Sequence, residues 1–186
     1  GDGSYSTYTS FVSYNAMLDS GMPLVLPVGD YRVVATSYEA SDAGSGVSET
    51  PYFEGSQEFV IEEKTVTSVP KLLCTFESVG VELQLSEQFR NLLETQPLNY
   101  TYTVNVQAGT TSWTFNQTNA APVYFLNGCE ELVVKVSVKL DNLPYPERTY
   151  RVANEGCVRT GEYYIITLDA GPDAAQLATK CIGGNV

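Results

Sequence analysis

The 186-residue sequence contains no histidine at all. This absence excludes catalytic triads and metal centres that depend on imidazole, and it removes the side chain that most often transfers protons near neutral pH. Basic residues are also scarce, with 10 Lys and Arg against 22 Asp and Glu, which gives a net charge of −12. The composition therefore argues against binding to nucleic acid or to anionic membrane surfaces, because both attract basic patches.

Long apolar runs are missing too, since no stretch approaches the 18 or so apolar residues that a membrane-spanning helix needs. The sequence has no initiator methionine and no signal peptide, so we expect Gly1 to mark a processed or engineered start. Methionine occurs only twice, whereas 13 Tyr and 7 Phe are present. This balance suits β-strands better than helices.

The four cysteines form no Cys-x-x-Cys pair, which argues against zinc-knuckle and thioredoxin-like sites. Cys74 lies among Leu72, Leu73 and Phe76, and we expect it to be a buried thiol. Cys157 and Cys181 lie in loop-like sequence, so we expect at most one disulfide, between these two residues. Free thiols at all four positions are the alternative.

Alternation of apolar and polar residues predicts many short strands. A proline-glycine turn at residues 26–30 leads into one of them, and further strands are expected at 23–27 and 65–69. The clearest alternation runs from Leu132 to Leu140, whose even-numbered side chains should all face a core. Short helices are predicted near 13–19 and after a Ser86 cap.

These patterns predict an all-β chain of two antiparallel β-sandwich domains, of prealbumin-like or Greek-key type, with one or two short helices. The alternation restarts near Leu72, directly after Pro70. We therefore expect an N-terminal β-sandwich domain over 1–71 and a C-terminal β-sandwich domain over 72–186. The tail after Asp169 is rich in Gly, Ala and Pro, and we expect it to be weakly ordered.

Four aromatic residues near the N-terminus are the candidate ligand-binding residues: Tyr5, Tyr8, Phe11 and Tyr14. They are interleaved with Ser and Thr, the composition of many recognition surfaces. The alternative is that their rings only cover an open sheet. The loop from Ala40 to Thr50 is the second place to look. No catalytic residue or cofactor site is predicted. No metal site is predicted either, since the acidic pairs lack the spacing of a calcium loop.

Several segments resemble a known family. They are Leu26-Pro27-Val28-Gly29-Asp30-Tyr31, then Pro51-Tyr52-Phe53-Glu54-Gly55 followed by Phe59-Val60-Ile61, then Cys74 ahead of Val79-Gly80-Val81-Glu82-Leu83. In these the chain is similar to a domain-of-unknown-function family, number 4493, of Bacteroidales surface lipoproteins. The resemblance implies a fimbrillin-like or prealbumin-like architecture, a place on the cell surface, and an outer-membrane lipid anchor upstream of Gly1.

Three functions follow in order of preference. The first is a non-enzymatic surface adhesion module, monomeric rather than oligomeric, which binds an extracellular glycan or protein partner. The second is a structural subunit of a fimbria-like assembly, in which an extended segment completes the sheet of another subunit. The third, a glycan-active hydrolase, ranks lowest, although a pair of carboxylates can assemble in space without a sequence signature.

Overall fold

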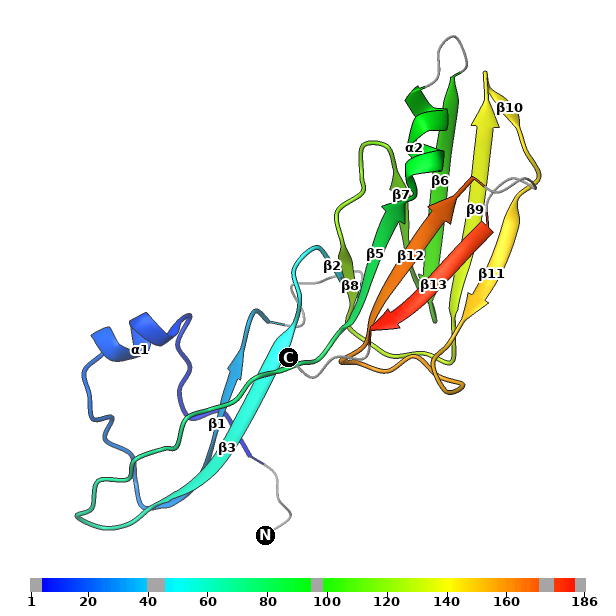
Figure 1. Cartoon of the computed structure of the whole chain (residues 1–186). Helices are drawn as coiled ribbons and strands as arrows, with labels where there is room; N and C mark the ends of the chain where they lie inside the picture. The colour runs from blue at the N-terminus through cyan, green and yellow to red at the C-terminus, as the bar shows by residue number, and fades with distance from the viewer. Residues whose placement is uncertain (1–4, 40–45, 95–98, 171–175, 183–186) are drawn as a thin grey trace. The chain divides into compact units, whose positions relative to one another are not determined.

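The computed structural model describes residues 5–39, 46–94 and 99–170, together with the backbone of residues 176–182 (Figure 1). Its elements, in chain order, are α1 (Tyr14–Asp19), β1 (Gly29–Thr36), β2 (Val47–Ser48), β3 (Phe53–Ile61), β4 (Thr75–Phe76), β5 (Val79–Leu85), α2 (Glu87–Glu94), β6 (Tyr100–Ala108), β7 (Thr111–Asn116), β8 (Val123–Phe125), β9 (Leu132–Leu140), β10 (Leu143–Pro144), β11 (Arg148–Val152), β12 (Tyr163–Asp169) and β13 (Gln176–Ile182). The predicted all-β fold with short helices is confirmed.

The chain forms two compact units. Unit 1 comprises Gly1–Thr36 and Glu54–Cys74, and unit 2 comprises Ser37–Phe53 and Thr75–Val186. Part of the N-terminal half thus belongs to unit 2. The two β-sandwich domains expected over 1–71 and 72–186 stay a prediction. No helix in the described part of the chain is long and apolar enough to cross a membrane.

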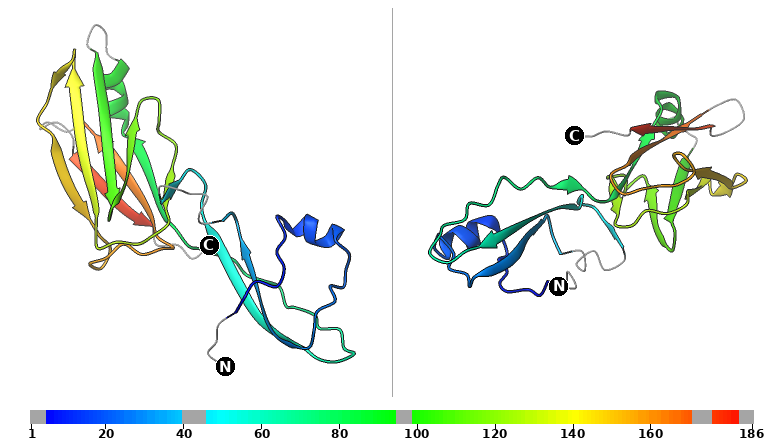
Figure 2. Two further views of the ribbon diagram at one scale, coloured as in Figure 1. Left: turned by 180° about the vertical axis from the view of Figure 1, so that it is seen from behind. Right: turned by 90° about the horizontal axis from the view of Figure 1, so that it is seen from below.

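Unit 2 contains two five-stranded sheets, which Figure 2 shows as two layers. One sheet has the order β10-β9-β6-β7, with β11 also paired to β9, and the other has the order β13-β12-β5-β8-β2. Most neighbours run antiparallel, as predicted, but β12 pairs with β5 in parallel. The partners in that pair lie some 80 residues apart in the chain, so neither local alternation nor a turn signal could predict it.

The core of unit 2 lies between these sheets. Val104 and Val106 of β6 are fully buried, and Leu132, Val134 and Val136 of β9 are buried beside them. The largest fully buried side chains of the unit include Tyr164, Phe115, Phe125, Ile166 and Leu168. Each contributes roughly 1.5–3 kcal/mol to stability through burial of its apolar surface. The predicted inward face of residues 132–140 is therefore correct, although burial declines toward the Leu140 end.

Helix α2 begins where the sequence predicts. The Ser86 hydroxyl accepts a hydrogen bond from the backbone N–H of Phe89 at 3.1 Å, which caps the first turn. The same hydroxyl donates to Asp169, at the end of β12. Phe89 is the buried residue of the helix, and its ring meets Tyr102 edge-on at 5.7 Å. The cap therefore holds the helix against the core.

Unit 1 is built around the antiparallel pair of β1 and β3, the β1–β3 hairpin. The register pairs Tyr31 with Phe59 and Arg32 with Glu58. Helix α1 is one short helix of six residues, and the Ser13 hydroxyl caps it by accepting from the N–H of Ala16 at 3.1 Å. The helix predicted near 13–19 is confirmed. Within the described residues of unit 1 we find one sheet, not the two sheets of a sandwich.

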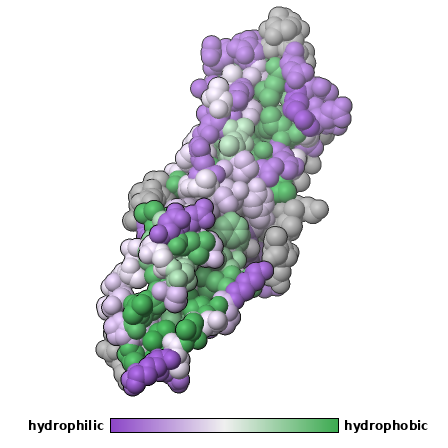
Figure 3. Space-filling view, turned by 90° about the vertical axis from the view of Figure 1, so that its left-hand side faces the viewer, coloured by the Kyte–Doolittle hydropathy of each residue, from purple (hydrophilic) through white to green (hydrophobic). Residues whose placement is uncertain are grey.

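Apolar side chains of unit 1 are largely exposed. Strand β1 alternates between half-buried and exposed residues, and none of its side chains is fully covered. Figure 3 shows apolar side chains gathered on the surface of unit 1. Those of unit 1 with large exposed fractions are Tyr5, Tyr8, Phe11, Val12, Tyr14, Leu18, Met22, Val25, Val28, Val34, Val60, Val66, Val69 and Leu73. Among the described residues, only Phe53, Leu143 and Tyr145 of unit 2 compare with them.

Three local predictions are wrong. Residues 23–27 and 65–69 are not strands, because neither segment finds a hydrogen-bonding partner strand in the described part of the chain. The weak order expected for the tail after Asp169 stays a prediction, and the backbone of residues 176–182 forms β13, which pairs antiparallel with β12. Cys74 is exposed, not buried, since no layer of unit 1 covers it. Residues 40–45 of the predicted loop lie outside the described residues, and Val47 near its end is buried in the core.

Candidate functional site

All four predicted binding residues lie at the surface of unit 1. The exposed fractions are 45% for Tyr5, 62% for Tyr8, 36% for Phe11 and 70% for Tyr14. Residues 5–11 have no regular secondary structure, and Tyr14 begins α1. None of the four rings is therefore positioned by a strand of its own. Two of them, Tyr5 and Tyr8, are held by contacts of their side chains with the hairpin.

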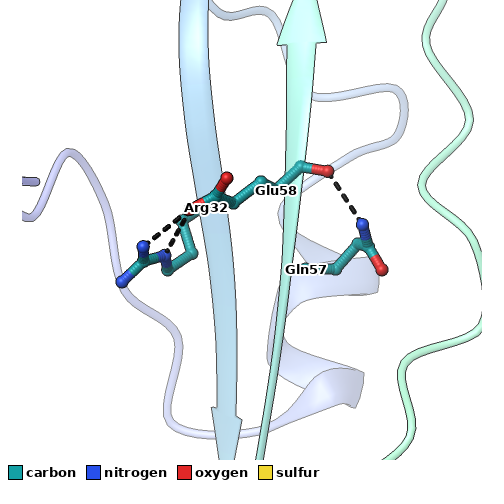
Figure 4. Close-up of polar contacts among 3 residues, drawn as sticks. All are labelled: Arg32, Gln57 and Glu58. Atoms are coloured by element: carbon teal, nitrogen blue, oxygen red, sulfur yellow. Dashed lines mark hydrogen bonds and ion pairs between the residues drawn. The ribbon is translucent and has the colours of Figure 1, made fainter. Parts of the chain in front are cut away.

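Tyr5 packs against an ion pair on the hairpin. The guanidinium carbon of Arg32 lies 4.4 Å from the centre of the Tyr5 ring, within the range of a cation–π contact. Arg32 also donates to Glu58 Oε1, from Nη2 at 2.6 Å and from Nε at 3.3 Å (Figure 4). The two residues are directly opposite each other in the β1–β3 register, so the backbone pairing sets up the ion pair.

Tyr5, Arg32 and Glu58 shift one another's pKa values. Hydrogen bonds from Arg32 and then from Tyr5 hold the pKa of Glu58 below its usual value. Partial desolvation, followed by the neighbouring Glu58 carboxylate, raises the pKa of Tyr5. Near neutral pH the phenol thus remains a hydrogen-bond donor and Glu58 remains an anion. The arrangement fixes the Tyr5 ring on the hairpin and still leaves nearly half of that side chain accessible.

Tyr8 contacts a second set of rings. It meets Tyr31 edge-on at 6.2 Å, and Tyr31 stacks on its cross-strand partner Phe59 at 5.8 Å. The Tyr31 hydroxyl donates to the carbonyl of Pro27 at 3.0 Å. Consecutive strand residues point to opposite faces, so Tyr5 on Arg32 and Tyr8 on Tyr31 contact opposite faces of the hairpin. The N-terminal segment therefore binds both faces.

Phe11 and Tyr14 are not brought into this group. Among the residues described, no aromatic contact joins either ring to Tyr5 or Tyr8. The role of all four residues in binding stays a prediction. Sequence reasoning missed Arg32 and Glu58, which are 26 positions apart. Their opposite charges at facing positions could have indicated the pair only if the hairpin register had been known.

The cysteines offer no assembled site. The thiols of Cys74, Cys129 and Cys157 are free, and the side chain of Cys181 lies outside the described residues. The disulfide expected between Cys157 and Cys181 therefore stays a prediction, which counting of free thiols would test. The Cys157 sulfur accepts from Arg159 Nε at 3.1 Å. Burial raises the pKa of the Cys129 thiol, which argues against a reactive thiolate there.

Two acidic pairs in the sequence, Glu62-Glu63 and Glu130-Glu131, each have one member in an ion pair. Glu63 lies 3.0 Å from Lys64, and Glu131 forms an ion pair with Arg151. Within the described ranges, no three His, Cys, Asp or Glu side chains are grouped closely enough to hold a metal ion.

A family model described as "Domain of unknown function (DUF4493)" matches residues 4–181. The chain belongs to this family. No protein with a curated description matches the sequence.

Two solved structures are similar to this DUF4493 chain. One is a candidate cell adhesion protein from Bacteroides uniformis, with 13% identity and a TM-score of 0.44, matched over 82% of this chain and 65% of that one. The other is a candidate cell adhesion protein from Bacteroides ovatus, with 11% identity and a TM-score of 0.35, matched over 80% and 58%. The matched region thus spans less than two thirds of either structure.

The chemistry available on unit 1 of this DUF4493 chain is that of recognition. The Tyr5 and Tyr8 rings supply apolar area with a hydroxyl at the edge, and Arg32 and Glu58 supply a charged donor and an acceptor beside Tyr5. All of these groups are held by contacts within the unit. Such a surface can bind a partner without a large loss of side-chain entropy.

Proposed function

We propose that this chain is a non-enzymatic binding module at the cell surface, with a role in adhesion. The observation that carries the proposal is the pair of exposed rings, Tyr5 and Tyr8, fixed on the β1–β3 hairpin, with the Arg32–Glu58 ion pair beside Tyr5. Tyrosine provides a large contact area at a low entropic cost, and neighbouring polar groups provide orientation. The partner is an extracellular protein or glycan, and the module itself is a monomer.

The wider surface of unit 1 supports the same role. Val34 and Val60, which project from the hairpin, are each 52% exposed, and Val25 and Val66 in the flanking segments are 92% and 80% exposed. Apolar side chains gathered on one region and interrupted by charges are typical of surfaces that a partner covers. The proposal includes attachment to the outer membrane by a lipid anchor, as in the surface lipoproteins that the sequence resembles.

A binding screen tests the proposal. The purified chain and a variant with Tyr5→Ser, Tyr8→Ser and Tyr14→Ser are applied to arrays of immobilised glycans and extracellular matrix proteins. We expect the chain to bind at least one class of probe and the triple variant to lose that binding. Tyr145→Ser is the matched control, because Tyr145 is an exposed tyrosine of unit 2 with an exposed fraction of 39%. That control should bind like the unaltered chain.

Two results would contradict the proposal. One is a triple variant that binds every probe as the unaltered chain does. The other is turnover of a glycan or peptide that depends on a particular Asp or Glu, which would make the chain an enzyme. Circular dichroism and the unfolding midpoint check that the triple variant is folded. We expect it to be folded, because the buried core of unit 2 contains none of the three residues.

A strand-accepting subunit of a fimbria-like assembly is the second candidate. Its support is β1, an eight-residue strand at the edge of its sheet. A long edge strand offers backbone N–H and C=O groups to an added strand. Light scattering coupled to size exclusion separates the candidates, because the binding module stays monomeric as concentration rises and the subunit associates.

A further inference from the structure

A row of four aromatic rings begins on the outer side of one sheet of unit 2 and continues onto strand β4 and the first residue of β3. We call it the aromatic row: Tyr163 of β12, Tyr124 of β8, Phe76 of β4 and Phe53 of β3. The ring centres are 6.3 Å, 6.0 Å and 5.7 Å apart in that order. All four side chains are partly exposed, with Phe53 at 39%.

The outer position of the row follows from the strand register. Val79 and Val81 on β5, and Val123 and Phe125 on β8, all point into the core. The residues between them, Gly80 and Tyr124, must then point away from it. The register aligns Tyr163 with Gly80, Gly80 with Tyr124, and Tyr124 with Ser48. The row therefore begins on a line that crosses four strands.

Gly80 lets the Tyr163 ring lie across the sheet. A Cβ atom at position 80 would stand 2.2 Å from Cδ2 of Tyr163 and 2.7 Å from Cε2. Any side chain there would push the ring away. With glycine, the ring packs over the backbone of β5, so that its other face is turned outward. An aromatic ring over a cross-strand glycine is a recognised way of supporting that glycine, so the packing also has a structural role.

Polar groups beside this ring are already oriented. The Tyr163 hydroxyl donates to Glu82 Oε2 at 2.9 Å, and Gln84 Nε2 donates to Glu82 Oε1 at 2.8 Å. Each carboxylate oxygen retains a further lone pair for a ligand donor. Burial and then the Glu82 carboxylate raise the pKa of Tyr163, which keeps its hydroxyl protonated. A flat ring thus lies next to a fixed acceptor with two oxygens.

We propose that the aromatic row, with Glu82 and Gln84, is a binding surface for a neutral saccharide. A pyranose has an apolar C–H face that suits the negative face of the Tyr163 ring, and adjacent hydroxyls that can donate to the two Glu82 oxygens. The exposed Gln84 amide supplies a donor for a sugar oxygen. Aromatic walls with a few fixed polar groups are the usual make-up of small-ligand sites.

Charge selects among possible occupants. Glu82 accepts a hydrogen bond from Tyr163 of the row, and Glu77 directly follows Phe76, in a chain of net charge −12. An acidic glycan or an acidic protein segment would be repelled there. This proposal shares one assumption with the proposed binding role, that the chain is exposed to extracellular glycans. It uses none of the unit 1 residues.

The test uses the full chain and defined probes. Isothermal titration calorimetry measures binding of neutral hexasaccharides (gluco-, manno- and xylo-configured) and of an acidic oligogalacturonate. We expect at least one neutral probe to bind and the acidic probe not to bind. Tyr163→Ala should weaken binding by about tenfold or more, the loss of one well-packed aromatic contact. Tyr163→Phe, which keeps the ring and most of its packing, should retain most of the affinity.

Two further variants keep the outcome decisive if Tyr163→Ala is poorly folded. Glu82→Gln should lower affinity while the ring stays in place, and Tyr145→Ala should leave affinity unchanged. The proposal is overturned if no neutral probe binds, if the acidic probe is preferred, or if Tyr163→Ala and Glu82→Gln both bind as the unaltered chain does. If saccharide binding is instead lost only in the Tyr5, Tyr8 and Tyr14 triple variant, the unit 1 function stands and this proposal falls.

Discussion

Strands β1 of unit 1 and β9 of unit 2 show the same alternation in sequence but differ in depth of burial. In β9, Leu132 and Val134 are completely buried, whereas every inward residue of β1 remains partly accessible. The difference lies in what covers each strand. A second sheet packs on β9, while the described residues of unit 1 form one sheet, helix α1 and segments without regular structure. Alternation therefore specifies a strand and its inward face, but not how well that face is covered.

This contrast separates stability from recognition. The buried hydrophobic cluster of the described residues lies entirely in unit 2, and most of the exposed large apolar side chains lie in unit 1. Substitutions at equally apolar positions should accordingly have very different consequences in the two units. The largest contrast is expected for phenylalanine.

Phe115→Ala should lower the free energy of unfolding of unit 2 by about 3–5 kcal/mol, through lost burial and the cavity left behind. Phe115 is fully buried, whereas Phe11 in unit 1 is 36% exposed. Phe11→Ala is the matched change and should cost far less. Urea denaturation measures both, with fluorescence of Trp113 reporting on unit 2, where this single tryptophan packs against the core, and far-UV circular dichroism reporting on both units. Equal costs would show that the two units do not differ as described.

A smaller effect is expected at the cap of α2. Ser86→Ala removes both the acceptor for the Phe89 N–H and the donor to Asp169. Loss of a helix cap typically costs about 0.5–2 kcal/mol. Ser86→Thr keeps the hydroxyl and should restore most of the loss in the same urea experiment. A Thr variant as unstable as the Ala variant would mean that the cap is not the reason.

These residues also show what the sequence could predict. Ser86 followed by Glu87 indicated the start of α2 correctly, because capping is a local interaction. The parallel pairing of β5 with β12 and the Tyr163–Gly80 packing were not predicted, since they join residues far apart in the chain. For the candidate site, sequence indicated Tyr5 and Tyr8 from composition alone. The Arg32–Glu58 pair that fixes Tyr5 depends on the hairpin register, which no alternation pattern contains.

Acid sensitivity should arise in unit 2 at Glu162. Burial opposes ionisation of this carboxyl, but hydrogen bonds from the Tyr164 hydroxyl, the Arg159 N–H and Asn154 outweigh it and lower its pKa. A lowered pKa in the folded state adds stability above the unfolded value of 4.5, and that stability is lost as pH falls through the folded pKa.

Glu162→Gln tests this contribution. The variant should be less stable than the unaltered chain near pH 6, and the gap in unfolding midpoint should narrow as pH falls below about 4.5. A gap that stays constant down to pH 3 would show that the Glu162 charge contributes nothing. Glu155→Gln is the control, since Glu155 is an exposed glutamate in the same loop.

The smallest change in stability is expected in unit 1, at the Arg32–Glu58 pair. Both side chains are well exposed, so water and salt screen their attraction, and Glu58→Gln should leave the unfolding midpoint unchanged within error. The effect should be local instead. The Arg32 side chain holds the Tyr5 ring on the hairpin, and Glu58 holds the Arg32 side chain in place. Glu58→Gln should therefore speed amide hydrogen exchange in residues 5–12. Arg32→Lys keeps the charge but loses the planar group that stacks on Tyr5, and should speed exchange too.

If Arg32→Lys exchanges like the unaltered chain and Glu58→Gln does not, then charge alone holds the segment. If neither variant changes exchange, the rings of Tyr8, Tyr31 and Phe59 hold the segment without help from the ion pair.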